Sequence, residues 1–328
     1  MMLSKIITTR KYKAWPSFHL IYEWEDIISN TFNIPLFYES KLYGMFNSII
    51  RRVPYNGSIP LINKKYSNML RFEISARNSS DTYNRENILP VIVDFHISES
   101  DLTGFINAYK NNPFVLISSA EVMKFLDERE VPLKYYHFPL SLPDFYQFKK
   151  DMLSDKKYDL LLAGRQNPIL KEYLDQYIKE NPNFVYVYEK LEDGKFTYCT
   201  NKGEILGEFK DRKSYISLLR QSRVSLYSTP GIDGGESRTK GFNQVTPKFL
   251  EFLAAGCHVL ARYKDNPDTD FFHISEFSPH INSYEMFKRE MDYALNHPID
   301  ADKYESYLEK HYTSCRVNLL KNILKNYN

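Results

Sequence analysis

Short apolar runs alternate with amphipathic stretches along most of the chain, the pattern of an α/β protein built on parallel sheets. From residue 86 onward, runs of β-branched and other apolar residues predict buried strands at 90–95, 114–118, 135–138, 158–164, 184–187, 224–228 and 258–261. Apolar positions at helical spacing predict helices between them and a long amphipathic helix over 302–327. Residues 35–85 are broken by Pro35, Pro54 and Pro60 and give no regular pattern.

A polar segment at 143–157, rich in Lys and Asp, separates two α/β halves of similar size. The length of 328 residues also favours two domains. We therefore expect a Rossmann-like domain over 1–150, a second over 151–300, and a C-terminal helix over 301–328 that packs back toward the first domain.

Charge balance and cysteine content narrow the class of protein. The 43 Lys and Arg nearly balance the 41 Asp and Glu, which argues against a dedicated nucleic-acid-binding protein. The 3 Cys are widely spaced and lack zinc-ligand spacing, and no apolar stretch has the length of a signal peptide or a membrane span. We expect a cytoplasmic protein, at most peripheral on the inner face of the membrane.

The most informative segment is 244–261, QVTPKFLEFLAAGCHVLA. Thr246 suits a helix N-cap and Pro247 suits the first helical position, so a helix is predicted to begin there. Lys248 and Glu251 are the charged residues of that helix, three positions apart near its amino end. A helix amino end with a lysine attracts a diphosphate, and a carboxylate one turn deeper can accept hydrogen bonds from ribose hydroxyls. A solvated Lys/Glu pair is the alternative interpretation.

Two other predicted strand ends carry polar residues. Gly164 and Arg165 end one strand, just before a helix that starts at Asn167. Ligands of open parallel sheets bind at the carboxyl ends of strands, so Arg165 is placed to meet a phosphate. The strand at 224–228 continues into a polar, glycine-containing loop, 229–243, of the kind that contacts a ligand or closes over it.

These features together resemble the C-terminal nucleotide-binding domain of GT-B glycosyltransferases, specifically the group 1 class typified by glycosyltransferase family 4. The resemblance covers about residues 155–296 and rests chiefly on the Pro-Lys-x-x-Glu-x-x-Ala-x-Gly run at 247–256. It implies the GT-B architecture, in which two Rossmann-like α/β domains face each other across a cleft.

The resemblance also implies a set of donor-binding residues. Arg165 and Lys248 would hold the donor diphosphate, and Glu251 would hold the donor ribose. Gly164 and Thr246 belong to the same set.

One position departs from that family's pattern. The family's Glu-x7-Glu pair would place its first glutamate, which contacts the donor sugar, at residue 243, where this chain has Asn243. Asn243 can still hydrogen-bond a sugar hydroxyl, and Glu236 in the preceding loop is a candidate substitute. Retaining and inverting mechanisms both stay open. Inverting fucosyltransferase-like GT-B enzymes, which have a similar Thr-x-Lys helix start, are a second group of relatives.

In the first half, Asp94 and His96 lie where the predicted strand 90–95 ends, at the carboxyl edge of its sheet. His96 can act as a base near neutral pH, and Asp94 can do so if the reaction inverts. A buried structural histidine is the alternative. Asp94, His96 and Asn243 are the catalytic candidates.

The activity expected is transfer of a sugar from a UDP- or GDP-linked donor to a glycan or lipid-linked acceptor, bound by the first domain. No cofactor or metal is expected, because cations and helix termini can stabilise the departing diphosphate. The resemblance suggests bacterial surface polysaccharide synthesis, such as that of lipopolysaccharide or capsule. The alternatives are an inverting fucosyltransferase-like enzyme, a sugar-nucleotide epimerase of the same fold, and a non-catalytic nucleotide-binding subunit of a polysaccharide-synthesis complex.

The positive charge is concentrated near the N-terminus. Residues 1–85 hold 12 Lys and Arg against 6 Asp and Glu. The cations and the tryptophan that would suit an anionic membrane or a lipid-linked acceptor are Arg10, Lys11, Lys13, Trp15, Arg51 and Arg52. Ordinary solvated charges are the alternative interpretation.

Overall fold

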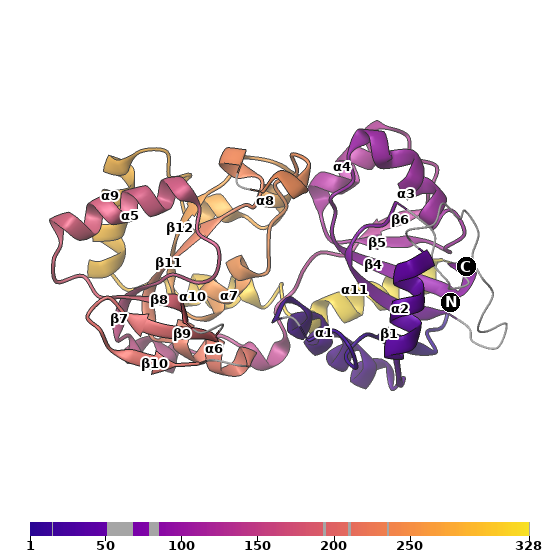
Figure 1. Cartoon of the computed structure of the whole chain (residues 1–328), viewed down its shortest axis with the longest axis horizontal. Helices are drawn as coiled ribbons and strands as arrows, with labels where there is room; N and C mark the ends of the chain where they lie inside the picture. The colour runs from indigo at the N-terminus through magenta and orange to yellow at the C-terminus, as the bar shows by residue number, and fades with distance from the viewer. Residues whose placement is uncertain are drawn as a thin grey trace. The chain divides into compact units, whose positions relative to one another are not determined.

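A computed structural model describes residues 1–14, 16–50, 68–78, 85–192, 195–208, 211–234 and 236–327. The chain folds into two compact α/β units (Figure 1). Unit 1 comprises Met1–Pro143, Arg238–Phe242 and Tyr312–Asn328. Unit 2 comprises Asp144–Ser237 and Asn243–His311. Trp15, Arg51 and Arg52 of the predicted membrane contact lie outside the described residues.

In the part of unit 1 that the structure describes, six parallel strands form one sheet, in the order β2-β1-β3-β4-β5-β6. They are β1 (Lys5–Thr8), β2 (Leu36–Tyr38), β3 (Met69–Ser75), β4 (Ile88–Asp94), β5 (Val115–Ile117) and β6 (Tyr135–His137). β2 and β3 fall within residues 35–85, where no strand was predicted. The strand order reverses between β1 and β3, which makes that pair the topological switch point of the sheet.

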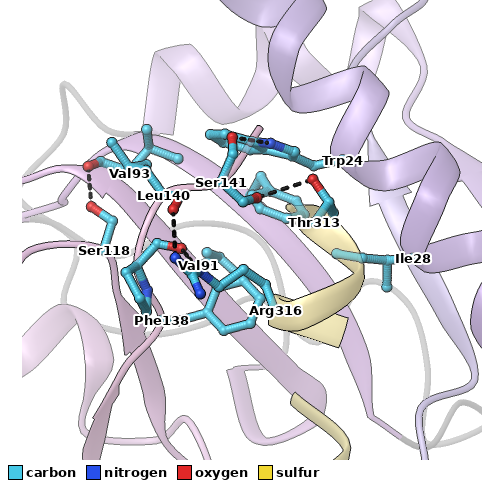
Figure 2. Close-up of a pocket in the computed structure, with 12 residues that line it drawn as sticks. Trp24, Ile28, Val91, Val93, Ser118, Phe138, Leu140, Ser141, Thr313 and Arg316 are labelled. Atoms are coloured by element: carbon cyan, nitrogen blue, oxygen red, sulfur yellow. Dashed lines mark hydrogen bonds between the residues drawn. The ribbon is translucent and has the colours of Figure 1, made fainter. Parts of the chain in front are cut away.

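The helices of unit 1 are α1 (Pro16–Phe32), α2 (Lys41–Ile50), α3 (Leu102–Tyr109), α4 (Ala120–Glu128) and α11 (Thr313–Asn326). α11 packs against α1 and is fixed by buried hydrogen bonds. Arg316 Nε donates to the carbonyl of Pro139 at 2.9 Å, and its Nη2 donates to the carbonyl of Leu140 at 3.2 Å (Figure 2). The cavity beside Arg316, lined also by Trp24 and Thr313, is about the size of one water molecule. It is therefore a packing gap and not a substrate site.

Among the described residues of unit 2, the sheet also has six strands, in the order β10-β9-β8-β7-β11-β12. They are β7 (Tyr158–Leu161), β8 (Tyr186–Glu192), β9 (Lys195–Thr200), β10 (Ile205–Gly207), β11 (Ser222–Ser228) and β12 (His258–Arg262). β7, β8, β11 and β12 are parallel, whereas β9 and β10 add antiparallel pairs at one edge. After β7 the chain adds β8 on one side and later β11 on the other, so the switch point lies between β7 and β11.

The helices of unit 2 are α5 (Pro168–Glu180), α6 (Arg212–Arg220), α7 (Lys248–Ala254), α8 (Pro267–Phe271), α9 (Tyr284–Asn296) and α10 (Ala301–Leu308). α5 and α9 pack together, and their apolar sides meet β7, β11 and β12 in one core. Fully buried members of this core include Leu160, Leu174, Val224 and Phe287.

Residues 302–327 do not form the single helix that their apolar spacing predicts. α10 ends at Leu308, and α11 begins at Thr313 after Tyr312 in extended backbone (φ −70°, ψ 156°). α10 belongs to unit 2 and α11 to unit 1. Apolar spacing shows which residues are buried but not in which core they are buried. When two consecutive helices share the same spacing, the pattern therefore does not reveal the turn between them. In the parts of the chain that the structure describes, no helix is both long and apolar enough to cross a membrane.

Candidate functional site

The switch point of unit 2 gathers three of the predicted donor-binding residues. Gly164 and Arg165 follow β7, and Lys248 is the first residue of α7. Lys248 Nζ donates to the carbonyl of Ala163 at 3.0 Å, across 85 residues of sequence. The fold therefore brings the strand end at β7 and the start of α7 into direct contact.

Gly164 is required at this contact for two reasons. Its φ is +65°, in the left-handed region that side chains disfavour. A Cβ on residue 164 would also lie 2.3 Å from Lys248 Nζ. Glycine thus lets the lysine ammonium approach the backbone after β7.

Lys248 is a weakly compensated cation. Desolvation of its ammonium group lowers its pKa, and the nearby charge of Glu251 raises it only in part. Among the described residues, no carboxylate forms an ion pair with Lys248. A desolvated cation whose partner is a neutral carbonyl favours an anionic ligand, because the ligand would supply the missing negative charge.

Arg165 is the most exposed cation of the group. Its guanidinium pairs with Glu236 in the loop that follows β11. The Arg165 side chain is 61% exposed, whereas that of Glu236 is 12% exposed. Because the Arg165 end of the pair is open to solvent, its guanidinium is accessible to a phosphate that could replace this carboxylate.

Glu251 already has a cationic partner inside unit 2. Arg212 Nη2, on α6, donates to Glu251 Oε1 at 2.8 Å. Both side chains are largely buried. Sequence reasoning did not identify Arg212, which lies 39 positions from Glu251.

Thr246 does not cap α7 through its side chain, contrary to the prediction. The N-cap is Pro247, already in helical backbone (φ −55°, ψ −23°), and the helix begins at Lys248. The Thr246 backbone N–H instead donates to the hydroxyl of Tyr227 at 3.0 Å. The helix thus begins one residue later than an N-cap at Thr246 requires, and Thr246 lies two positions before Lys248.

Asn243 lies at the end of the loop after β11 and is 5% exposed. Its carboxamide oxygen accepts a hydrogen bond from Thr229 Oγ1 at 3.1 Å. Its backbone carbonyl accepts one from Asn266 Nδ2 at 3.1 Å. Asn243 thus ties together the two ends of this loop and the start of α8.

Asp233 is a site residue that sequence reasoning missed. Its carboxylate accepts hydrogen bonds from Arg262 Nε at 2.6 Å and Nη2 at 2.8 Å, and from Asn167 Nδ2 at 2.8 Å. Arg262 is the last residue of β12, and Asn167 follows β7. Because β7 and β12 flank β11 in the sheet, Asp233 holds the loop after β11 to both neighbouring strands. The φ of Asp233 is +55°, an unusual conformation for a residue other than glycine. Its partners lie 29 and 66 positions away in the sequence, so no local sequence signal singled it out.

In unit 1, β4 ends at Asp94 and His96 follows it. His96 Nε2 lies 3.9 Å from Asp94 Oδ2, and neither ring nitrogen of His96 makes a hydrogen bond within the described part of the chain. Burial lowers the pKa of His96, and the charge of Asp94 opposes that effect. The imidazole is therefore mainly neutral near pH 7, the form that a general base needs.

The loop after β11 also contributes to unit 1. The ring of Phe242 packs edge-on against Phe95 at 5.4 Å, next to His96 in sequence. Burial raises the pKa of Asp94, and the charge of Arg238 opposes that effect while it adds to the lowering of the pKa of His96. The same loop therefore supplies Glu236 to Arg165 in unit 2 and Arg238 to the Asp94–His96 pair in unit 1.

The sequence matches no protein-family profile and no curated protein. Among solved structures, the chain is similar to a protein assigned as a UDP-N-acetylglucosamine 2-epimerase from Listeria monocytogenes, with 11% identity and a TM-score of 0.51 over 100% of this chain and 97% of that one. It is also similar to a chain of the GtfA/B complex, with 10% identity and a TM-score of 0.50 over 80% of this chain. The match spans 57% of the length of that GtfA/B chain.

At this level of identity the likeness defines a fold. The expectation of an α/β protein with the GT-B fold is confirmed, because each unit carries a largely parallel sheet with helices and the similar structures are GT-B proteins. Membership of glycosyltransferase family 4 stays a prediction.

Proposed function

We propose that the chain is a glycosyltransferase that moves a sugar from a UDP- or GDP-linked donor to a glycan or lipid-linked acceptor. The observation that carries the proposal is the weakly compensated ammonium of Lys248 beside Gly164, at the switch point of unit 2. Switch points are where open α/β sheets bind ligands, and a desolvated cation there favours a diphosphate.

The donor-binding roles follow from the contacts at the switch point. Lys248 and Arg165 bind the diphosphate and stabilise its charge as it departs, with Arg165 releasing Glu236 when the donor arrives. Arg212 fixes the carboxylate of Glu251, whose other oxygen accepts hydrogen bonds from the ribose. Gly164 lets the Lys248 ammonium reach the end of β7, where the diphosphate binds, and Thr246 lies two positions before Lys248 in the same donor-binding set.

The acceptor is assigned to unit 1. His96, neutral near pH 7 and close to Asp94, removes the proton from the acceptor hydroxyl. Asn243 orients the donor sugar through its carboxamide. The basic N-terminal segment fits an acceptor at the cytoplasmic face of a membrane, as in synthesis of bacterial surface polysaccharides.

Nucleotide binding tests the donor site directly. Thermal shift with UDP, GDP and their sugar conjugates is expected to show stabilisation by one nucleotide family, by about 2.7 kcal/mol at 100 times the dissociation constant. Lys248→Met removes the ammonium but keeps the stem, and it should weaken binding by at least about tenfold. Lys213→Met, an exposed lysine of α6, is the matched control and should bind as the wild type does. No shift with any nucleotide would refute the donor site.

A sugar-nucleotide epimerase is the second candidate function, because the similarity to the epimerase-assigned protein extends along both whole chains. The two activities are separated by incubating nucleotide sugars in deuterated water without an acceptor. Epimerisation would change the sugar in that sample, whereas a transferase needs an acceptor to release the nucleoside diphosphate. For a transferase, the anomeric configuration of the product then distinguishes retention from inversion. Donor binding without turnover would instead indicate a non-catalytic subunit.

A further inference from the structure

The α2 helix of unit 1 presents an apolar face to solvent. Leu42, Met45, Phe46 and Ile49 follow helical spacing and are 78%, 56%, 44% and 58% exposed. We call these four residues the α2 apolar face. Single exposed apolar residues are ordinary, but four on one side of a ten-residue helix form a contiguous patch of the kind that marks an interaction site.

The opposite side of α2 is the one that packs on unit 1. A Cβ on Gly44 would lie 2.9 Å from the ring of Tyr12, so the helix backbone rests directly on this tyrosine. Around the helix, Leu42 and Phe46 lie about 160° from Gly44, Ile49 about 140° and Met45 about 100°. The α2 apolar face is therefore exposed because the opposite side of the helix packs on unit 1.

The charged residues that neighbour this face in the sequence are positive. Residues 40–52, SKLYGMFNSIIRR, contain three cations and no carboxylate. Lys41 is exposed, and Lys11 Nζ lies 5.4 Å from the ring centroid of Tyr38, which is 45% exposed. The nearest carboxylate in sequence, Glu39, is buried and pairs with Arg71.

We propose that the α2 apolar face inserts into the interfacial region of a bilayer that contains anionic lipids. The apolar side chains enter the boundary between headgroups and acyl chains, while Lys11 and Lys41 contact the anionic headgroups. Tyr38 is an amphipathic ring of the type that lies at headgroup level.

The charge pattern favours a lipid surface over a second copy of the chain. A symmetric dimer through α2 would bring the lysines of both copies together, and like charges at an interface oppose association. An anionic surface instead compensates them. The inference deepens the membrane-proximal part of the proposed function, and its test uses no nucleotide, so the two can fail separately.

Vesicle sedimentation of the full chain tests the proposal. Two vesicle types are used, phosphatidylcholine alone and a mixture with roughly one third phosphatidylglycerol. The wild-type chain should sediment with the mixed vesicles, and the double variant Leu42→Ser/Ile49→Ser should partition at least about tenfold less. Leu191→Ser/Ile205→Ser, on exposed residues of unit 2, is the matched control and should sediment as the wild type does.

A charge variant gives an independent measurement. Lys11→Gln/Lys41→Gln should reduce the preference for mixed over neutral vesicles, and added salt should do the same. The proposal is overturned if the wild-type chain does not sediment, or if the α2 double variant, folded as judged by its thermal transition, sediments as the wild type does. It is also overturned if light scattering shows a dimer that the α2 variant converts to a monomer while vesicle binding is unchanged.

Discussion

Arg212 and Glu251 form a buried ion pair, with Arg212 Nη2 donating to Glu251 Oε1 at 2.8 Å. Their side chains are 14% and 4% exposed. The carboxylate assigned to the donor ribose therefore also neutralises a guanidinium from another helix. Loss of nucleotide binding in Glu251→Ala would not by itself identify a ribose contact, because the same change leaves Arg212 unpaired.

Glu251→Ala is expected to lower the free energy of unfolding by about 3 kcal/mol, since it strands a largely buried guanidinium. Adding Arg212→Ala should recover part of that loss, with a coupling energy of about 1–3 kcal/mol in the double-mutant cycle. Urea denaturation of the four proteins measures both quantities. Strictly additive effects would show that the pair contributes nothing, and the ribose assignment could then be read directly from Glu251→Ala.

Gly164→Ala should destabilise unit 2 through both backbone strain and a collision with Lys248. The left-handed backbone alone costs about 1–2 kcal/mol for an alanine. Gly234→Ala is the matched control, because Gly234 has φ +67° and a Cβ there would meet nothing within 4 Å. Gly164→Ala should lower the free energy of unfolding more than Gly234→Ala does. In the double variant Gly164→Ala/Lys248→Met, the part of the loss that comes from the collision with the Lys248 ammonium should disappear. Equal losses at the two glycines would contradict the contact.

Asp233→Asn should loosen the loop after β11. Asn tolerates φ near +55°, so the backbone conformation is retained while the charge-assisted bonds to Arg262 are weakened. Native-state tryptic cleavage at Arg238 or Lys240 should become at least about fivefold faster. Asp265→Asn, at an exposed carboxylate, is the control. An unchanged cleavage rate would mean that Asp233 does not hold the loop.

His137 should make the folded state sensitive to acid. Its Nε2 donates to the carbonyl of Ser118 at 3.2 Å, and burial lowers the pKa of His137 to about 4 from 6.5. The unfolded chain binds this proton below pH 6.5 and the folded chain only near pH 4, so stability is lost as the pH falls between these values, by at most about 1.4 kcal/mol per pH unit.

The variant His137→Gln keeps a donor for Ser118 and cannot titrate. Its stability should depend less on pH between 6.5 and 4 than that of the wild type. His273→Gln, on an exposed side chain, should leave the slope unchanged. Denaturant midpoints across this pH range provide the measurement, and identical slopes in all three proteins would exclude His137 as the source.

The fold could be predicted where burial and apolarity coincide. β4 and β7 stand out in the sequence because nearly all their residues are apolar. β3 does not, because Arg71 and Glu73 interrupt it although each is only 4% exposed. Their charges are compensated by Glu39, 3.6 Å from Arg71, and Arg77, 3.2 Å from Glu73. A strand that buries ion pairs looks like a loop until its tertiary partners are known.

Residues of the candidate site were predictable only where their own short segment indicates ligand binding. Arg165 and Lys248 each stand at a strand end or helix start that favours phosphate. Their partners come from elsewhere in the chain: Glu236 for Arg165 and Ala163 for Lys248. Arg262 and Asp233 also pair across a distance in the sequence, since they lie 29 positions apart. Long-range pairing is set by the strand order, which apolar spacing does not encode.

The segments of the two units alternate along the chain, and this fixes the order in which a ribosome can complete them. Unit 1 begins first, but it still lacks Arg238–Phe242 while the first part of unit 2 is made, and it lacks α11 until Thr313–Asn326 follows. Unit 2 has all its residues once His311 has been made. During synthesis the space beside Trp24 that Arg316 and Thr313 later line is still open. The unit that starts second is therefore the first that can close its core, and the unit that starts first can close its own only after α11 has been made.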